Sequence, residues 1–171
     1  MSAGRIWAGW RSAYVASVDS PAGADGDPGT CVFCGLAGSE DAEAALVVHR
    51  GSTCMVVLNA YPYTTGHMLV VPTRHVARLD DLDREEFEEL WTTTVAAIGA
   101  VERAYGPDGV NMGANLGRAA GAGLPGHVHM HVLPRWVGDT NFMTAVADVR
   151  VMPETLPSSW RRLVAAWAPP Q

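Results

Sequence analysis

Lysine is absent from this 171-residue chain, so all 12 of its basic residues are arginine. The 18 acidic residues outnumber them, and the formal net charge is -6 at pH 7. A protein held on nucleic acid by charge needs a basic surface, so we expect no nucleic-acid partner. The composition still allows a small phosphorylated ligand, because arginine, histidine or backbone N–H groups can hold one locally.

Long apolar runs are also missing, since no stretch approaches the roughly 20 residues that a membrane helix needs. The first residues lack the charged start and apolar core of a secretory signal. Three cysteines, an odd number, do not suit a disulfide framework. With 48% hydrophobic residues, the chain can bury the core of one domain. We therefore expect a soluble single-domain protein of the cytoplasm with no membrane partner.

The strand signals are short and are joined by tight turns. Two apolar runs within 45–58, split by Arg-Gly-Ser, predict a hairpin. Residues 67–71, 110–116 and 127–133 predict three further strands. This pattern favours an antiparallel α+β domain over a βαβ arrangement.

Two helices complete the expected set of elements. Residues 83–105 predict a long helix, which Asp83 and Glu86 begin with a capping-box pattern and the glycines and proline of 106–109 end. Residues 158–167 predict a short helix near the end of the chain. The apolar stripe of the long helix is expected to contain Phe87, Leu90, Thr94, Val95, Ile98 and Val101.

The most informative segment is Gly-His-Val-His-Met-His-Val-Leu-Pro at 126–134. Side chains alternate between the two faces of a strand, so His127, His129 and His131 are expected on one face, roughly 7 Å apart. Each imidazole carries two polar nitrogens that need partners, so three in register indicate a functional site rather than apolar packing. The pattern leaves metal ligation and catalysis both open.

These residues resemble the signature of the histidine-triad (HIT) family of nucleotide hydrolases and transferases, in which three histidines alternate with apolar residues. Residues 59–75, 111–115 and 134–139 are similar to the family as well. The N-terminal Ile-Trp-Ala-Gly-Trp segment and the Cys-Val-Phe-Cys motif resemble the bacterial branch of diadenosine tetraphosphate phosphorylases and hydrolases. The likeness covers about residues 5–143, and it implies a HIT-like fold: an antiparallel five-stranded sheet with a long helix and a short C-terminal helix.

The resemblance divides the chain into three parts. Residues 1–30 form an aromatic segment followed by a flexible Gly/Pro/Asp loop, 31–145 form the HIT domain, and 146–171 form a tail with the short helix. It also implies a homodimer whose interface contains the long helix and a sheet edge. The N-terminal aromatics Trp7, Trp10 and Tyr14 are expected as anchors of that interface.

The resemblance implies that the triad is catalytic and that His129 is the nucleophile, which takes the nucleotidyl group as a covalent phosphoramidate. A neutral imidazole attacks at neutral pH without a separate base, and its other nitrogen should donate to a backbone carbonyl. His131 is expected to bind the phosphoryl oxygens or the leaving group. His127, the first triad residue, need not act in catalysis if it binds a metal.

Cys31 and Cys34 form a C-x-x-C pair, a spacing that suits a redox pair, a zinc site or two plain thiols. In zinc-bearing members of the family the ligands correspond to these two cysteines, His75 and His127. Two cysteines and two histidines form a closed tetrahedral site, so structural Zn²⁺ is the expected metal. Mg²⁺ or Mn²⁺ is a further candidate, as a companion of the substrate.

Four residues correspond to substrate-binding positions of the family, and three of them also have a plainer interpretation. Asn59 matches the ribose-binding position, although it also suits a turn. His67 corresponds to a residue behind the triad, or to a hydrogen-bonded core histidine. Asn115 corresponds to a polar residue facing the α-phosphate. Trp136 suits stacking on a second base, walling of the leaving-group side, or plain packing.

The loop at 117–126 departs from the family pattern, because it offers no hydroxyl or amide side chain where relatives carry Gln, Ser or Thr. Backbone N–H groups between Gly121 and Gly123 are expected to contact phosphate in their place.

Three functions therefore compete. The first is cleavage of dinucleoside polyphosphates, such as diadenosine tetraphosphate, at the α-phosphate, with phosphate or water as the acceptor. The second is hydrolysis of a nucleoside phosphoramidate or nucleotide conjugate. The third is nucleotide binding without turnover.

Overall fold

The computed structural model describes residues 28–139 and 152–168. The predicted N-terminal anchors Trp7, Trp10 and Tyr14 lie outside these residues. Within the described part of the chain, none of the helices has the length and apolar character to cross a bilayer.

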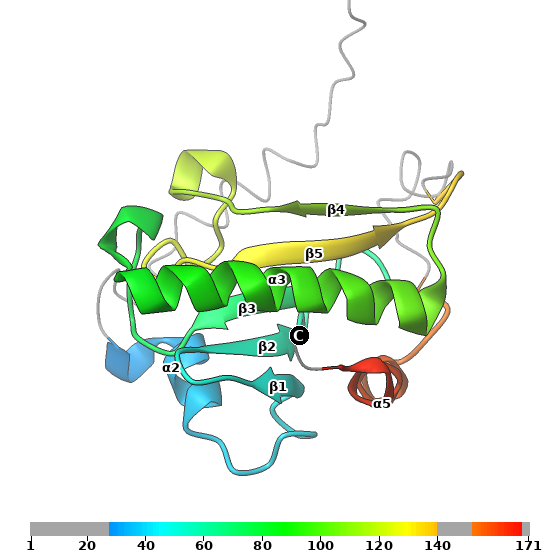
Figure 1. Ribbon diagram of the computed structural model, residues 1–171, viewed down its shortest axis with the longest axis horizontal. Helices are drawn as coiled ribbons and strands as arrows, with labels where there is room; N and C mark the ends of the chain where they lie inside the picture. Colours follow the sequence, from blue (N-terminus) through cyan, green and yellow to red (C-terminus); the bar gives the residue numbers. More distant parts are fainter. Residues whose placement is uncertain (1–27, 140–151, 169–171) are drawn as a thin grey trace, which may run out of the picture.

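Five antiparallel strands form one sheet in the order β1-β2-β3-β5-β4, which confirms the predicted fold class. In Figure 1 the long helix α3 lies across one face of the sheet, and α5 lies beside its β1 edge. The strands are β1 (Val47–Arg50), β2 (Cys54–Leu58), β3 (Met68–Pro72), β4 (Gly109–Gly113) and β5 (Met130–Arg135). The helices are α2 (Val32–Ala37), α3 (Arg84–Tyr105) and α5 (Leu156–Ala166), with short 3-10 turns η1 (Pro28–Thr30), η2 (Leu79–Asp81) and η3 (Arg118–Ala120).

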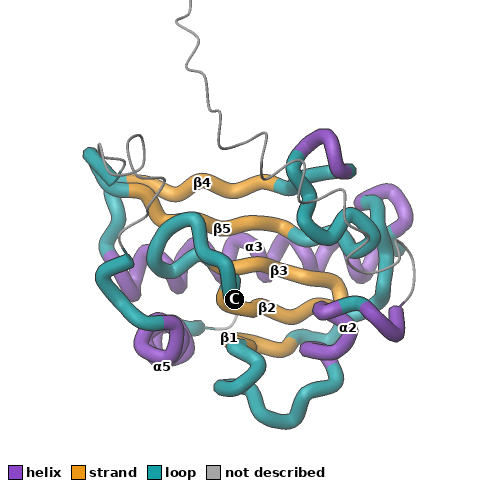
Figure 2. The backbone as a smooth tube through the Cα atoms, turned by 180° about the vertical axis from the view of Figure 1, so that it is seen from behind, coloured by secondary structure: helices purple, strands orange, loops and turns teal. Residues whose placement is uncertain are grey.

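Both faces of the central strands are covered, because every residue of β2 and β3 is buried. Alternate side chains enter two separate clusters, as the two-residue period of a strand requires. One cluster, with Val56 and Val70, packs under α3 and α5. The other, with Val57 and Val71, packs under Phe33 of α2. Figure 2 shows the α2 side of the sheet, with α3 behind it.

Helix α3 begins with the predicted capping box, in which the Asp83 side chain accepts from the Glu86 N–H and the Glu86 side chain accepts from the Asp83 N–H. Gly106, at φ 53°, ends the helix in the left-handed conformation that glycine adopts without strain.

The predicted apolar stripe of α3 is partly wrong, because Phe87 and Val95 are 42% and 65% exposed. The buried side instead includes Thr93, Ala97 and Ala100, whose small side chains let the helix approach the sheet closely. The helix therefore keeps a partly apolar outer side.

The predicted strand at 127–133 begins later in the structure, since β5 starts at Met130. Residues 127–129 run ahead of the strand, and the Val128 N–H donates to the carbonyl of Val76 at 2.7 Å. The triad therefore spans the point at which the chain enters the sheet.

Candidate active site and metal centre

Two of the triad histidines lie just before β5 and the third lies within it, with exposed fractions of 1% for His127 and 7% each for His129 and His131. The rings of His129 and His131 are in contact, with centroids 4.9 Å apart. Burial on this scale requires a partner for most ring nitrogens, so the hydrogen bonds determine where each proton lies.

The imidazole of His129 is fixed by the backbone just before it. Its Nδ1 lies 2.9 Å from the carbonyl oxygen of His127, which can only accept, so Nδ1 carries the proton and donates. In the neutral ring, Nε2 then keeps its lone pair. Among the described residues no hydrogen bond engages Nε2, so His129 offers a nitrogen suited to nucleophilic attack.

The proton of His131 is placed by a chain of hydrogen bonds from the β2–β3 turn. The backbone N–H of Tyr61 donates to Asn59 Oδ1 at 2.9 Å, so the amide nitrogen of Asn59 faces His67 Nδ1 at 3.2 Å. The backbone N–H of Tyr63 also donates to that Nδ1, at 3.1 Å. His67 must therefore carry its proton on Nε2.

That proton points at His131, because His67 Nε2 lies 2.9 Å from His131 Nδ1. His131 Nδ1 accepts, so the proton of His131 is on Nε2, on the opposite side of the ring. Asn115 Nδ2 lies 3.4 Å from this Nε2, so a protonated Nε2 requires the Asn115 amide to turn its oxygen toward the ring and accept. His129 therefore presents a lone pair beside an N–H donor from His131.

Burial keeps these rings neutral. It lowers the pKa of His131 to about 4, with the neighbouring His129 adding to the effect. Burial also lowers the pKa of His129, although the hydrogen bond to the His127 carbonyl opposes the shift. Neither ring is therefore expected to be charged at neutral pH.

The turn that delivers His67 depends on Gly66, whose φ is 79°. A side chain at Gly66 would collide with the ring of Tyr105 at the end of α3. Gly66 therefore both forms the turn before His67 and lets that turn pack closely against the end of α3.

Some of the backbone donors expected from the glycine loop already have partners within the loop. The N–H of Gly121 donates to the carbonyl of Arg118 at 2.9 Å, and the N–H of Ala122 lies 3.3 Å from the carbonyl of Gly117. Both bonds close the η3 turn on itself. Of the backbone N–H groups predicted to contact phosphate, that of Gly123 is the one left for this role in the present conformation.

Trp136 is not brought to the triad within one chain. It follows the far end of β5, five residues beyond His131, or roughly 16 Å at the strand rise. Its ring instead meets Tyr105 edge-on, with centroids 6.3 Å apart.

The four expected metal ligands do meet. The candidate ligand atoms of Cys31, Cys34, His75 and His127 lie within 4.8 Å of one another. The Cys31 and Cys34 sulfurs are 3.3 and 3.8 Å from His127 Nδ1, and Cys34 is 3.3 Å from His75 Nδ1. In tetrahedral zinc geometry, sulfur and nitrogen ligands are about 3.6 Å apart, so these spacings suit the ion.

The ring of His127 is oriented for such a site. Its Nε2 lies 2.9 Å from the carbonyl of Pro72, so Nε2 donates and Nδ1 keeps a lone pair toward the cysteines. A backbone carbonyl behind a ligand histidine commonly fixes its tautomer in metal sites. Cys54 takes no part, because its thiol is buried against Thr93 on the α3 side of the sheet.

Two aromatic neighbours of the triad were not predicted. The ring of Tyr63 stacks beside that of His131, with centroids 5.8 Å apart. Phe33 meets both His127 and His129, with centroids 5.4 and 5.0 Å apart. In the sequence, the only feature that could have pointed to Phe33 as a neighbour of the triad is its position between the two candidate metal ligands Cys31 and Cys34.

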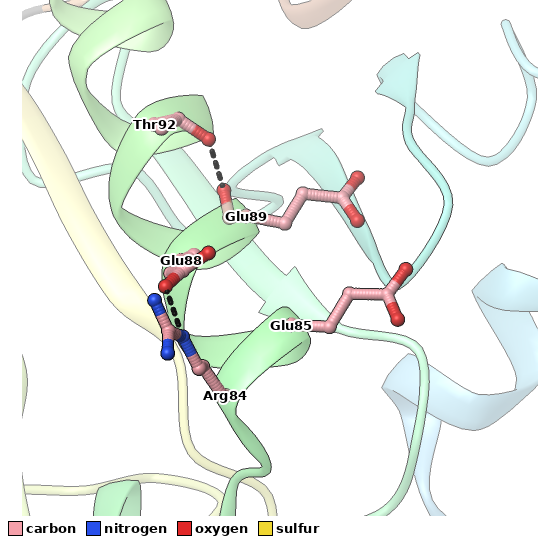
Figure 3. Close-up of a pocket in the computed structure, with 5 residues that line it drawn as sticks. All are labelled: Arg84, Glu85, Glu88, Glu89 and Thr92. Atoms are coloured by element: carbon pink, nitrogen blue, oxygen red, sulfur yellow. Dashed lines mark hydrogen bonds and ion pairs between the residues drawn. The ribbon is translucent and has the colours of Figure 1, made fainter.

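A pocket near the start of α3, shown in Figure 3, contains none of these residues. Two of its three carboxylates have structural partners: Glu89 accepts from the N–H groups of Ser52 and Thr53, and Glu88 pairs with Arg84. We assign this pocket no functional role.

The metal site makes a direct prediction. Protein prepared without chelator should contain about one zinc per chain, and Cys34→Ser should lose most of it with a lower melting temperature. Cys54→Ser, a substitution at the cysteine outside the cluster, is the matched control and should keep its metal. Elemental analysis with thermal unfolding measures both, and equal metal content in the two variants would contradict the site.

Comparison with known proteins gives a consistent result. A model of the HIT domain matches residues 41–137, more than half of the chain. The AP-4-A phosphorylase of Mycobacterium tuberculosis (strain ATCC 25618 / H37Rv) is 45% identical over 126 residues, which cover 74% of this chain and 65% of the phosphorylase. The chain thus spans slightly less than two thirds of that relative.

Two more distant relatives point to the same family. The asymmetrical bis(5'-nucleosyl)-tetraphosphatase of Schizosaccharomyces pombe is 34% identical over 93 residues, 54% of this chain and 50% of that enzyme. The crystal structure of a Zn-bound histidine triad family protein from Mycobacterium smegmatis superposes with a TM-score of 0.66 and 29% identity, covering 82% of this chain and 94% of that one. This chain is a member of the HIT domain family.

Proposed function

We propose that the protein cleaves dinucleoside polyphosphates, such as diadenosine tetraphosphate, by nucleotidyl transfer through His129. The observation that carries the proposal is the pairing of a neutral lone pair on His129 Nε2 with an N–H donor on His131 Nε2. The relatives named as a phosphorylase and a tetraphosphatase support the choice of substrate class.

In the first step, the His129 Nε2 lone pair attacks the α-phosphorus, and the bond from this phosphorus to the bridging oxygen breaks. The leaving polyphosphate takes the electron pair, and the His131 N–H donates a hydrogen bond to that oxygen. The His127 carbonyl stabilises the positive charge that develops on the His129 ring, because it accepts from Nδ1. In the second step, phosphate or water attacks the same phosphorus and releases His129.

We propose that the four-ligand cluster holds structural Zn²⁺. When bound, the ion would cross-link α2, the segment after β3 and the start of β5, which carry its ligands. It supplies rigidity rather than reaction chemistry, because all four coordination positions are filled by the protein. Two reduced cysteines are what the proposed site needs, and thiols stay reduced most readily in the cytoplasm, the compartment that we propose.

Hydrolysis of a nucleoside phosphoramidate or nucleotide conjugate is the second candidate. It is favoured by the loop at 117–126, where the Gly121 N–H is engaged and hydroxyl side chains are absent. Such substrates have a simpler leaving group and need fewer contacts on that side.

A homodimer is also part of the proposal. The outer side of α3 exposes Phe87, Trp91 and Val95 at four-residue spacing, and the edge strand β4 exposes Met112. A second copy would cover these apolar side chains and the open strand edge together.

The reaction is tested by product analysis with diadenosine tetraphosphate, with and without inorganic phosphate. ADP plus ATP formed only with phosphate would establish a phosphorylase, and AMP plus ATP without phosphate a hydrolase. His129→Ala should abolish the product in either case, whereas His49→Ala, a histidine outside the site, should not. Full activity in His129→Ala would contradict the mechanism. No product from the wild type would favour the second candidate.

The proton chain to His131 is tested by Asn59→Asp. The carboxylate can still accept from the Tyr61 N–H and from ribose hydroxyls, but it cannot donate to His67 Nδ1. We expect kcat to fall about tenfold, the effect of one hydrogen bond, with KM within about twofold. A raised KM at unchanged kcat would mean that Asn59 acts only on the ribose.

The dimer is tested by light scattering, which should give twice the mass of one chain. Val95→Glu should produce monomers, because it places a charge among the exposed apolar side chains on the outer side of α3. Glu88→Gln on the same helix should leave the dimer intact. A wild-type mass of one chain would exclude the dimer.

A further inference from the structure

The strongest unassigned feature of the structure is the aromatic residue inside the C-x-x-C motif. Phe33 lies on α2 between the two cysteines of the candidate metal cluster, and it is only 5% exposed. Its ring does more than fill the core, because it touches imidazoles on both sides of the boundary between the metal cluster and the catalytic residues.

The geometry of these two contacts differs. Phe33 meets the ring of His127 at 84°, an edge-to-face arrangement that aromatic rings prefer, with centroids 5.4 Å apart. It meets the ring of His129 at 59°, with centroids 5.0 Å apart. The same phenyl ring therefore packs on a metal ligand and on the nucleophile.

A second link runs through the backbone. The carbonyl of His127 accepts the Nδ1 proton of His129, while the ring of His127 faces the cysteine sulfurs. The hydrogen bond holds the His129 ring at one nitrogen, but a single bond leaves the ring free to tilt about that point. A wall against one side of the ring is needed to aim Nε2.

We propose that Phe33 is a positioning residue that couples the metal centre to His129: metal binding fixes α2, and the phenyl ring between the cysteines holds the imidazole in its reactive orientation. This inference rests on the proposed function only in naming His129 as the nucleophile. The coupling itself concerns the free protein.

The packing around Phe33 explains why the metal is needed. Helix α2 has only six residues and no side-chain cap at its N-terminus, the end that carries the cysteines and Phe33. Its C-terminal end is held by Arg50, which donates to the carbonyls of Leu36 and Ala37. Phe33 sits in the smaller of the two core clusters, with Val47, Met55 and Leu69. Without the cross-link through Cys31 and Cys34, the N-terminal half of this helix would be held mainly by that cluster, since Arg50 acts only at the other end.

The inference is tested on metal-loaded full-length protein labelled with ¹⁵N at histidine, because the imidazole resonances report the tautomer and order of each ring. In Phe33→Leu and Phe33→Ala, the His129 resonances should shift toward an average of the two tautomers, with metal content unchanged. Those of His131, which belongs to the proton chain from His67, should stay in place. Leu36→Ala is the matched control, since Leu36 packs on the same cluster from the same helix.

The metal dependence completes the test. Removing the metal should perturb the His129 resonances more in the wild type than in Phe33→Ala, because the variant has already lost the coupling. With an active substrate, kcat of Phe33→Leu should fall roughly 10- to 100-fold at little-changed KM, the usual cost of a misplaced reacting group.

Unchanged His129 resonances in both Phe33 variants would overturn the inference, as would an equal effect of Leu36→Ala or an equal effect of metal removal on both proteins. Circular dichroism shows whether each variant is folded. If Phe33→Ala has lost its fold, the result for Phe33→Leu alone decides whether the inference stands. These outcomes do not depend on turnover, so a wrong substrate assignment would leave the coupling result intact.

Discussion

The arrangement of the site depends on the three residues His127 to His129, which lead into β5. The carbonyl of His127 takes the proton of His129, the ring of His127 donates to Pro72, and its remaining nitrogen faces the two cysteines. One short stretch of backbone therefore orients a candidate metal ligand and the proposed nucleophile together. Because each neutral imidazole has one donor and one acceptor, fixing one nitrogen also decides the chemistry of the other.

The same rule extends to the far side of the site. Backbone N–H groups of the β2–β3 turn can only donate, so they set the proton of His67 and, through it, that of His131. Burial supports this arrangement because it disfavours the charged ring, and the pKa of His131 accordingly falls to about 4. The proposed nucleophile His129 and the proposed donor His131 are thus both neutral, and the proposal needs no lysine, which the chain lacks.

Much of the fold could be predicted from local signals. The hairpin, the capping box of Asp83 and Glu86, and the antiparallel sheet follow from turn residues, apolar periodicity and cap chemistry. The outer side of α3 was misjudged at Phe87 and Val95, because periodicity does not say which of two partly apolar sides meets the sheet. The triad was placed wholly within a strand, but its first two histidines precede β5.

The site was predicted less completely than the fold. The convergence of Cys31, Cys34, His75 and His127 came from a family resemblance, and the structure brings these residues together. The engaged N–H of Gly121 and the contacts of Phe33 could not be predicted, because both depend on how distant segments fold against each other. Trp136 shows the same limit of sequence reasoning, because it matches a family position but follows the far end of β5, away from the triad.

The most direct test of the account is to quench the reaction with a dinucleoside polyphosphate within one turnover and map the modified peptide by mass spectrometry. The tautomers derived from the structure predict one nucleotidyl group, bonded to Nε2 of His129. A group on His131, or product formation with no covalent intermediate at any time point, would contradict the central claim.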